Sequence, residues 1–297
     1  MGAAYRSVGA YARLAAEIVA IAATPVVLAA CAIANFDQTA LLTLVVVLAS
    51  MGIFFASYEA SRPRLRDIMP TVVLAALAAA GRILFAPIPD FKPVSAIAII
   101  AGVAFGRKSG FMVGALAALA SNFFFGQGPW TPWQMYAWGL VGYGAGLLAM
   151  VPAKGRAAGA KDSSLARSRE ALGSTSDSSC SAAPDGEGEG VASSLRRQCT
   201  EEENRACATR RLIDAHPAIV YLYGFLACLG YGFILNAWSI LSFFHAQASG
   251  WAGVLAVYAT ALPFDIVHGV ATVVFLLALY GPWRRKLERV RRKFGLA

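Results

Sequence analysis

Charged residues are scarce in this sequence. Only 14% of its 297 residues are Asp, Glu, Lys or Arg, against about 25% in ordinary soluble domains, whereas 58% are hydrophobic. The few charges are also clustered, because 20 of the 43 charged residues fall in residues 152–216 and eight in residues 283–297. A soluble fold needs charge over its whole surface. This distribution therefore argues against an ordinary soluble domain and is typical of a polytopic membrane protein.

Several motifs that carry chemistry are also missing. The sequence contains no GxxxxGK[ST] phosphate-binding loop, no HExxH, and no GxSxG at a strand-to-helix turn. With five cysteines, three histidines and no CxxC, it supports neither a zinc site nor a disulfide framework, and free thiols facing a reducing cytoplasm are the simpler interpretation. We therefore predict no metal, no cofactor and no enzymatic activity. Uphill transport by this chain would need an ion gradient or another subunit.

Apolar runs predict an all-α, polytopic membrane bundle of about eight transmembrane helices. The predicted spans are residues 14–34, 40–57, 68–86, 93–105, 109–125, 132–151, 217–245 and 252–282. The fourth is short, because a helix of that length reaches only ~20 Å against a hydrocarbon core of roughly 30 Å. It must be shielded by neighbours, thin the bilayer, or extend through Phe91 and Gly106, unless residues 93–125 form a re-entrant hairpin.

Basic residues alternate between the connecting segments. One set of segments carries Arg6 and Arg13, three arginines in 62–66, Arg107 and Lys108, the residue 152–216 loop and the C-terminal RRKLERVRRK. The other set, residues 35–39, 87–92, 126–131 and 246–251, holds only Lys92. The positive-inside rule then places both termini in the cytoplasm. The net charge of +9 is thus explained by topology, and we predict no nucleic-acid partner.

Two further segments carry predictions about processing and organisation. Residues 156–212 are rich in Ser, Ala and Gly and poor in large apolar groups, which predicts a disordered cytoplasmic linker. This linker is either a plain tether or a site of phosphorylation or partner docking. Leu28-Ala29-Ala30-Cys31 resembles a lipoprotein cleavage box, although such a run also arises easily in Ala-rich helices.

Acidic groups within the predicted spans are few. Glu17 lies near the cytoplasmic end of the first span, and Asp265 lies midway along the last, with His268 three residues later. Tyr258, Asp265, His268 and Thr272 follow helical spacing and share one face. Because a charge at mid-membrane is costly, we expect Asp265 to face the bundle interior, with His268 as the nearest candidate partner. The pair is either a structural clasp or a ligand- or proton-handling site.

Small residues recur at helical spacing in three spans. Span three holds two small-xxx-small pairs, span five a run of four small residues, and span six three glycines. These residues are Ala75–Ala79 and Ala76–Ala80, then Gly110, Gly114, Ala118 and Asn122, then Gly139, Gly142 and Gly146. Small residues let helix backbones approach closely. The pattern indicates intramolecular packing or, for span three above all, a docking face for another protein.

Aromatic and amide residues gather in the outer segments. Residues 82–95 read RILFAPIPDFKPVS, residues 121–138 read SNFFFGQGPWTPWQMYAW, and LNAWS follows in span seven. The candidate site residues are Arg82, Asp90, Lys92, Asn122, Gln127, Trp130, Thr131, Trp133, Gln134 and Asn236. Rings supply stacking area and amides fix orientation, which suits a planar ligand. An interfacial aromatic belt is the alternative for the tryptophans, and we favour the binding site.

From about Ile68 to Val151 the sequence resembles the S components of energy-coupling factor (ECF) vitamin transporters. The resemblance rests on an Ala-rich opening helix, FKPVSAIAIIAGVAFG, and SGFMVGALAALASNFFFGQGPWTPWQMYAWGLVGYGAGLL, and extends to LPFDIVHGVATVVFLLAL with its basic tail. It implies a six-helix core, formed here by residues 61–155 and 213–283. The two N-terminal helices of residues 1–60, the linker 156–212 and the tail 284–297 lie outside that core.

The resemblance also implies a function and partners. An S component binds a vitamin or precursor at the extracellular side of a prokaryotic plasma membrane, then docks through an AxxxA-type surface on a coupling subunit attached to two ATPases. Here Ala75–Ala79 or Ala76–Ala80 would form that surface, and a corrinoid is our expected ligand, with riboflavin, another B vitamin or a nucleobase derivative as alternatives. A proton-coupled carrier using Asp265 and His268, or a membrane enzyme using the same pair, are the competing interpretations.

Overall fold

The computed structural model describes residues 39–61, 63–151, 216–243 and 246–294, together with residues 15, 17–19, 21–23, 26 and 213. Two predictions therefore lie outside the described residues, namely the disordered linker 156–212 and the cleavage box at residues 28–31. Most of the first predicted span, residues 14–34, lies outside them as well.

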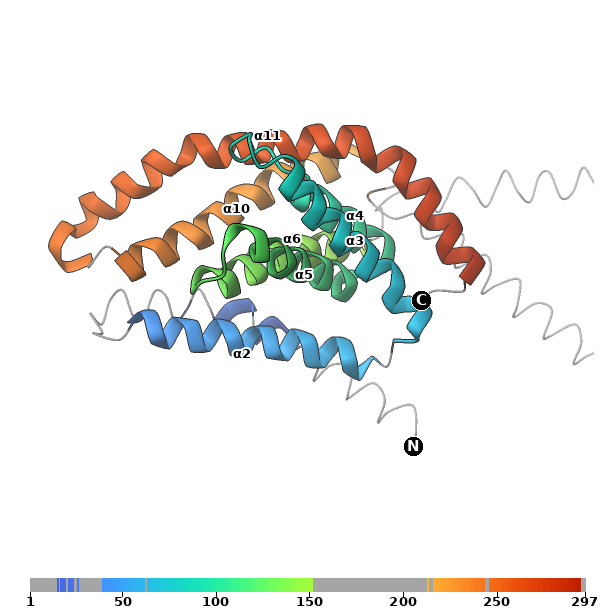
Figure 1. Ribbon diagram of the computed structural model, residues 1–297, viewed down its shortest axis with the longest axis horizontal. Helices are drawn as coiled ribbons and strands as arrows, with labels where there is room; N and C mark the ends of the chain where they lie inside the picture. The colour runs from blue at the N-terminus through green and yellow to red at the C-terminus, as the bar shows by residue number, and fades with distance from the viewer. Residues whose placement is uncertain are drawn as a thin grey trace, which may run out of the picture. The chain divides into compact units, whose positions relative to one another are not determined.

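The described residues form helices, with no strand among them (Figure 1). The helices are α2 (Thr39–Ala60), α3 (Leu65–Leu84), α4 (Val94–Phe105), α5 (Arg107–Phe125), α6 (Trp130–Leu148), α10 (Ala218–Phe243) and α11 (Ala246–Phe294). Each of the last seven predicted spans overlaps one of these helices. The predicted all-α fold class is confirmed, whereas the number of membrane crossings stays a prediction.

Four of these helices are long and apolar enough to cross a membrane. They are Leu65–Leu84, Arg107–Phe125, Ala218–Ile240 and Gly250–Arg291, and the shorter apolar helices Leu44–Ala60 and Val94–Phe105 accompany them. α11 continues beyond its apolar part, so the basic segment after Pro282 is helical as far as Phe294. Gly250, with φ of 57°, interrupts α11 near its start.

α4 is short and enclosed by its neighbours. Its 12 residues rise only about 18 Å, and the side chains from Val94 to Val103 are all buried. α4 packs against α3, α5, α6 and α11. Gly106, with φ of 91°, forms the one-residue turn into α5, a conformation that favours glycine. Of the options open for the fourth span, this arrangement shows shielding by other helices.

Glycines bring α4, α5 and α6 into backbone contact. A Cβ on Gly102 would lie 2.1 Å from the Gly142 carbonyl oxygen, and one on Gly142 would lie 2.1 Å from that of Gly110. One on Gly114 would lie 2.2 Å from the Trp138 carbonyl oxygen. No side chain fits at these distances. The small residues predicted in spans five and six therefore serve intramolecular packing, which confirms that interpretation for Gly110, Gly114 and Gly142.

The two small-residue pairs of α3 lie on different faces. Ala75 and Ala79 are buried, at 4% and 6% exposure, where α3 packs against α4 and α5. Ala76 and Ala80 are exposed, beside the exposed Leu77. Only Ala76–Ala80 is therefore accessible to another protein in this structure.

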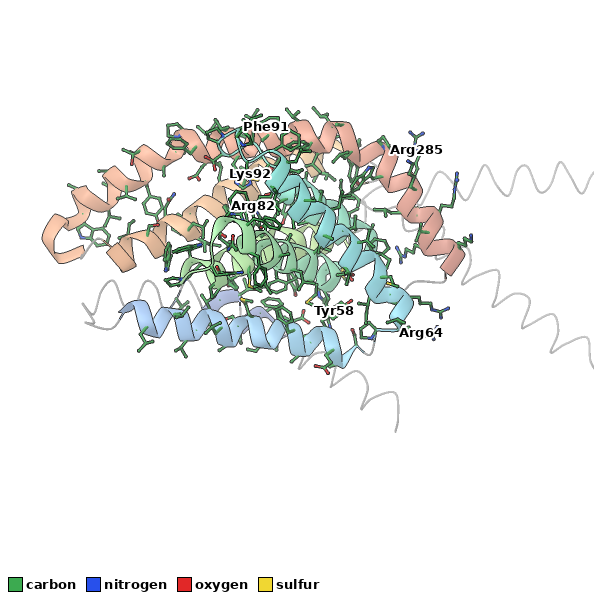
Figure 2. The ribbon with its side chains drawn as sticks, in the orientation of Figure 1. Tyr58, Arg64, Arg82, Phe91, Lys92 and Arg285 are labelled. Atoms are coloured by element: carbon green, nitrogen blue, oxygen red, sulfur yellow. The ribbon has the colours of Figure 1, made fainter. Side chains whose placement is uncertain are left out.

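Basic residues at the ends of different helices lie at one end of the described helices. Figure 2 shows this for Arg64, directly before α3, and for Arg285, in the last part of α11. The Lys108 Nζ donates a hydrogen bond to the Ser57 carbonyl oxygen over 2.7 Å, which places the α4–α5 turn beside the end of α2. At the other end, Trp130 at the start of α6 contacts Trp238 near the end of α10. This grouping agrees with the alternating assignment, and which end faces the cytoplasm stays a prediction.

A buried polar cluster joins the N-terminal part of the chain to the bundle. The Glu17 side chain is 1% exposed. It accepts hydrogen bonds from Ser57 Oγ of α2, from Tyr143 Oη of α6 over 2.7 Å and from Arg107 Nε over 3.1 Å. Lys108 Nζ lies 3.7 Å from its other oxygen. We name Glu17, Ser57, Arg107, Lys108 and Tyr143 the Glu17 cluster.

Candidate functional site

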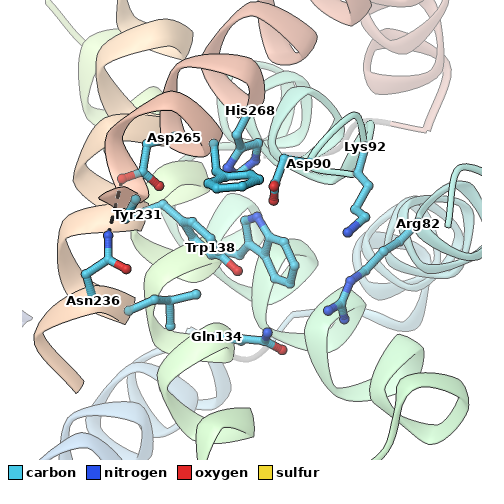
Figure 3. A pocket seen from close by; sticks show the side chains of 13 residues that line it. Arg82, Asp90, Lys92, Gln134, Trp138, Tyr231, Asn236, Asp265 and His268 are labelled. Atoms are coloured by element: carbon cyan, nitrogen blue, oxygen red, sulfur yellow. Dashed lines mark hydrogen bonds between the residues drawn. The ribbon is translucent and has the colours of Figure 1, made fainter. Parts of the chain in front are cut away.

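A cavity of about 320 Å³ lies between α3, α6, α10, α11 and the loop that joins α3 to α4 (Figure 3). Its lining residues are Arg82, Asp90, Lys92, Gln134, Trp138, Tyr231, Gly232, Leu235, Asn236, Ala261, Phe264, Asp265 and His268. This volume falls at the lower end of the roughly 300–1,000 Å³ of small-molecule pockets. Apolar, aromatic, amide and charged groups all face the same space.

Two aromatic rings form one wall of the cavity. Trp138 and Tyr231 stack with ring centroids 4.8 Å apart and an interplanar angle of 27°. His268 stands edge-on to Tyr231 at 5.1 Å. Aromatic walls of this kind offer a large, rigid stacking area at little cost in conformational entropy.

Two cations lie at one side of the cavity. Arg82, in the last turn of α3, is 7% exposed, and its guanidinium lies over the rings of Phe125 and Trp138 at 4.7 and 4.8 Å. Figure 3 shows the Lys92 ammonium beside it. Partial burial and the nearby Arg82 charge lower the pKa of Lys92 below its ordinary value, and Asp90 partly offsets this effect. Neither cation lies within 4 Å of a carboxylate of the described residues.

A hydrogen-bond network behind the cavity holds Arg82 in place. Arg82 Nη1 donates to Ser121 Oγ over 2.6 Å and to Asn122 Oδ1 over 2.7 Å. Asn122 Nδ2 in turn donates to Thr131 Oγ1 and Gln134 Oε1. Thr131 donates to Gln127 Oε1 over 2.9 Å. The amides that the sequence placed near the ligand thus fix both the guanidinium and the start of α6.

Acidic and polar groups of α10 and α11 form the opposite side. Asn236 Nδ2 donates to Asp265 Oδ2 over 3.3 Å. The carboxylate sits against Gly232, where a Cβ would lie 2.0 Å from Asp265 Oδ1, so only glycine leaves it this space. His268 Nε2 pairs with Ser95 Oγ over 2.9 Å, and Trp138 Nε1 also donates to Ser95 Oγ.

The predicted polar face of α11 packs against α10. Tyr258 Oη donates to the Phe233 carbonyl oxygen, Asp265 bonds Asn236, and Thr272 Oγ1 lies 3.1 Å from Cys228 Sγ. Asp265 therefore faces inward, as expected. Its hydrogen bond goes to Asn236 rather than to His268, whose partner is Ser95 on α4.

The structure divides the predicted site residues into three groups. Arg82, Asp90, Lys92, Gln134, Asn236, Asp265 and His268 line the cavity. Asn122, Gln127 and Thr131 form the supporting network behind it. Trp130 and Trp133 do not line it: Trp130 contacts Trp238, and Trp133 is fully buried.

Two important cavity residues, Trp138 and Tyr231, are not among the predicted ones. Trp138 follows Gln134 by four residues and so shares its helix face, a signal that the sequence contained. Tyr231 has no such local signal, because only the packing of α10 on α6 brings it to Trp138. Among the described residues, no group of three or more His, Cys, Asp or Glu is placed to hold a metal ion.

Comparison with known families gives one match. Residues 64–163, about a third of the chain, match the family model described as ECF-type riboflavin transporter, S component. This segment is similar to the S components of ECF transporters. The predicted resemblance is confirmed over these residues, which include α3, α4, α5 and α6 and exclude α2, α10 and α11. No curated protein and no solved structure gives a match.

The match and the fold together indicate a multi-pass membrane transport protein associated with vitamin uptake. S components form a transporter family and not an enzyme family. An S component is the substrate-binding subunit of such a transporter. The matched helices contribute Arg82, Gln134 and Trp138 to the cavity, together with Asp90 and Lys92 from the loop before α4.

Proposed function

We propose that this chain is the substrate-binding component of an ECF-type importer and that the cavity at Arg82, Trp138 and Tyr231 is its ligand site. The observation that carries the proposal is a coincidence of two independent features. The segment that matches the S-component family also supplies five of the cavity's lining residues. The cavity combines an aromatic wall with a few convergent polar groups, as ligand sites usually do.

The ligand that we propose is a vitamin or precursor with a flavin-like planar ring. The matching family is described as a riboflavin transporter component, and a stacked tryptophan and tyrosine suit a flat ring. A corrinoid, our expectation from the sequence, is much larger than a flavin. Neither the family description nor a cavity of about 320 Å³ supports a corrinoid, so the flavin-like ring replaces it.

Energy and partners would come from other proteins. The sequence has no phosphate-binding loop of the GxxxxGK[ST] type, so we propose that a coupling subunit and two ATPases supply ATP hydrolysis. Of the predicted docking residues, Ala76 and Ala80 are the exposed pair. Exposed small residues on an apolar helix allow the close helix approach that membrane interfaces use.

The first experiment measures uptake of radiolabelled riboflavin in cells that lack their own flavin importer. We expect uptake when the chain is expressed with a coupling subunit and ATPases, and none when it is expressed alone. Uptake by the chain alone that collapses with an uncoupler would contradict the proposal and favour the proton-coupled carrier using Asp265 and His268.

A second experiment tests the docking face by copurification with the coupling subunit. Ala76→Trp with Ala80→Trp should abolish copurification, because two large rings prevent close helix approach. Ala256→Trp, at an exposed alanine of α11, is the matched control and should copurify normally. Normal copurification of the Ala76 and Ala80 variant would contradict the assignment of this face.

A further inference from the structure

Arg82 holds most of its hydrogen-bonding capacity unused. The guanidinium carries five N–H donors in a planar fork, and only Nη1 makes hydrogen bonds to the described residues. Nε is buried and has no partner. The edge formed by Nε and Nη2 is therefore unsatisfied, in a side chain that is 7% exposed. A guanidinium with free N–H donors is a common partner for carboxylate and phosphate oxygens.

The charge of Arg82 is also unmatched. The carboxylates that line the same cavity, Asp90 and Asp265, do not lie within 4 Å of either Arg82 or Lys92. Lys92 adds a second positive charge on the same side of the cavity (Figure 3). Holding a buried guanidinium beside a half-buried ammonium without a counter-ion is costly, and the aromatic contacts of Arg82 offset only part of that cost.

A purely structural role explains this arrangement poorly. Ser121 Oγ already donates to the Ala117 carbonyl oxygen, and Asn122 already bonds Thr131 and Gln134. The network therefore positions the arginine, whose side chain lines the cavity and keeps an N–H donor without an acceptor.

We infer that the ligand carries an acidic group, a carboxylate or a phosphate, that binds between Arg82 and Lys92. This inference rests on the proposed function, since it concerns the same cavity. The ring of the ligand then lies against Trp138 and Tyr231, while Asn236 and Asp265 accept or donate hydrogen bonds at its far edge. The preferred substrate is thus an anionic, ring-containing solute, and a neutral flavin such as riboflavin binds the same cavity more weakly.

The test compares three flavins with the same ring and different side chains. Riboflavin is neutral, riboflavin 5′-phosphate carries a phosphate and 10-carboxymethylflavin carries a carboxylate. Calorimetric titration of the purified full chain in detergent should show at least one anionic flavin binding tenfold or more tightly than riboflavin. Which of the two does so identifies the acidic group.

Variants assign any such preference to the two cations. Arg82→Gln and Lys92→Gln should each reduce the ratio of anionic to neutral affinity to about one. Arg64→Gln changes an exposed arginine outside the cavity and should keep the ratio of the unaltered chain. If Arg82→Gln does not fold, Lys92→Gln and Arg82→Lys decide: the first should lose the preference and the second should keep part of it.

The outcomes separate this inference from the proposed function. Riboflavin binding without any preference for an anionic flavin overturns the inference and leaves the proposed function standing. Binding of no flavin overturns the flavin-like ligand, and benzoate and phenyl phosphate, titrated against benzyl alcohol, then decide the inference. Binding of either acid that is lost in Lys92→Gln supports it, and no binding of either acid overturns it.

Discussion

Two buried ionic sites in this chain are built in opposite ways. In the Glu17 cluster, one carboxylate meets Arg107, Lys108, a tyrosine and a serine. In the cavity, Arg82 and Lys92 meet no carboxylate of the described residues within 4 Å. In the Glu17 cluster, the charge of the carboxylate is paired within the chain. In the cavity, Arg82 keeps an N–H donor without an acceptor. The difference separates the Glu17 cluster, which is a structural site, from the cavity, which is the candidate ligand site.

The Glu17 cluster also explains how the N-terminal part of the chain is attached to the other helices. Glu17 and α2 contact residues of α5 and α6, because Arg107 begins α5 and Tyr143 lies on α6. A second link runs from Tyr136 Oη to the Ile21 carbonyl oxygen over 3.1 Å. These contacts lie away from the exposed Ala76–Ala80 face of α3, so attachment at α5 and α6 leaves the proposed docking face uncovered by α2.

The largest expected effect is the loss of stability when the ion pairs of the Glu17 cluster are removed. Glu17→Gln removes the buried carboxylate that pairs with Arg107 and Lys108 and should destabilise the protein by about 3 kcal/mol, seen as a lower unfolding temperature in detergent. Glu288→Gln, which removes a partly exposed pair with Arg284, is the control and should change little. An unaltered unfolding temperature in Glu17→Gln would show that the cluster stabilises nothing.

Removing the aromatic wall should weaken ligand binding. Trp138→Leu removes the ring that stacks on Tyr231 and should weaken flavin binding about tenfold, or ~1.4 kcal/mol. Trp130→Leu is the matched control, since Trp130 contacts Trp238 and does not line the cavity. Equal losses of affinity in the two variants, measured by calorimetry, would remove the cavity as the ligand site.

A smaller loss of stability is expected when Ser57 of the Glu17 cluster is replaced. Ser57→Ala removes one donor to Glu17 and should cost about 1 kcal/mol, because three other donors or cations remain. Ser61→Ala is the control, since Ser61 is exposed and bonds only within its own turn. A loss for Ser57→Ala as large as that of Glu17→Gln would mean that the serine, and not the charge, holds the cluster.

The smallest expected effect is on the stability of the ligand-free protein when Arg82 of the cavity is replaced. Arg82→Gln removes two buried hydrogen bonds but also relieves a buried cation that has no counter-ion. The two effects offset each other, so the ligand-free protein should change in stability by less than about 1 kcal/mol. Thermal unfolding without added ligand measures this change. A loss comparable to that of Glu17→Gln would place Arg82 among the structural residues and remove the contrast between the two sites.

The sequence was sufficient for the helices and for half of the site. Apolar runs located each described helix, and the scarcity of polar groups in such runs drew attention to Arg82, Asp265 and His268. Helix orientation about its own axis was harder to predict. Trp133 and Trp138 lie in one short run, yet one is fully buried away from the cavity and the other lines it.

Long-range pairings explain the rest. Glu17 meets Arg107 across 90 positions of sequence, and Ser95 meets His268 across 173. The pairing of Asp265 with His268 was expected from their spacing on one helix, but tertiary packing gave each residue a partner on another helix. Likewise, the two alanine pairs of α3 look alike in the sequence, and only packing against α4 and α5 buries one of them.

The most direct test of a ligand-binding role is mass spectrometry of small molecules released from the purified chain. We expect a ring-containing solute with an acidic group in amounts comparable to the protein, released without ATP or partner subunits, and strongly depleted in Trp138→Leu. The same compounds in equal amounts from both proteins, or none from either after addition of flavins, would contradict the account.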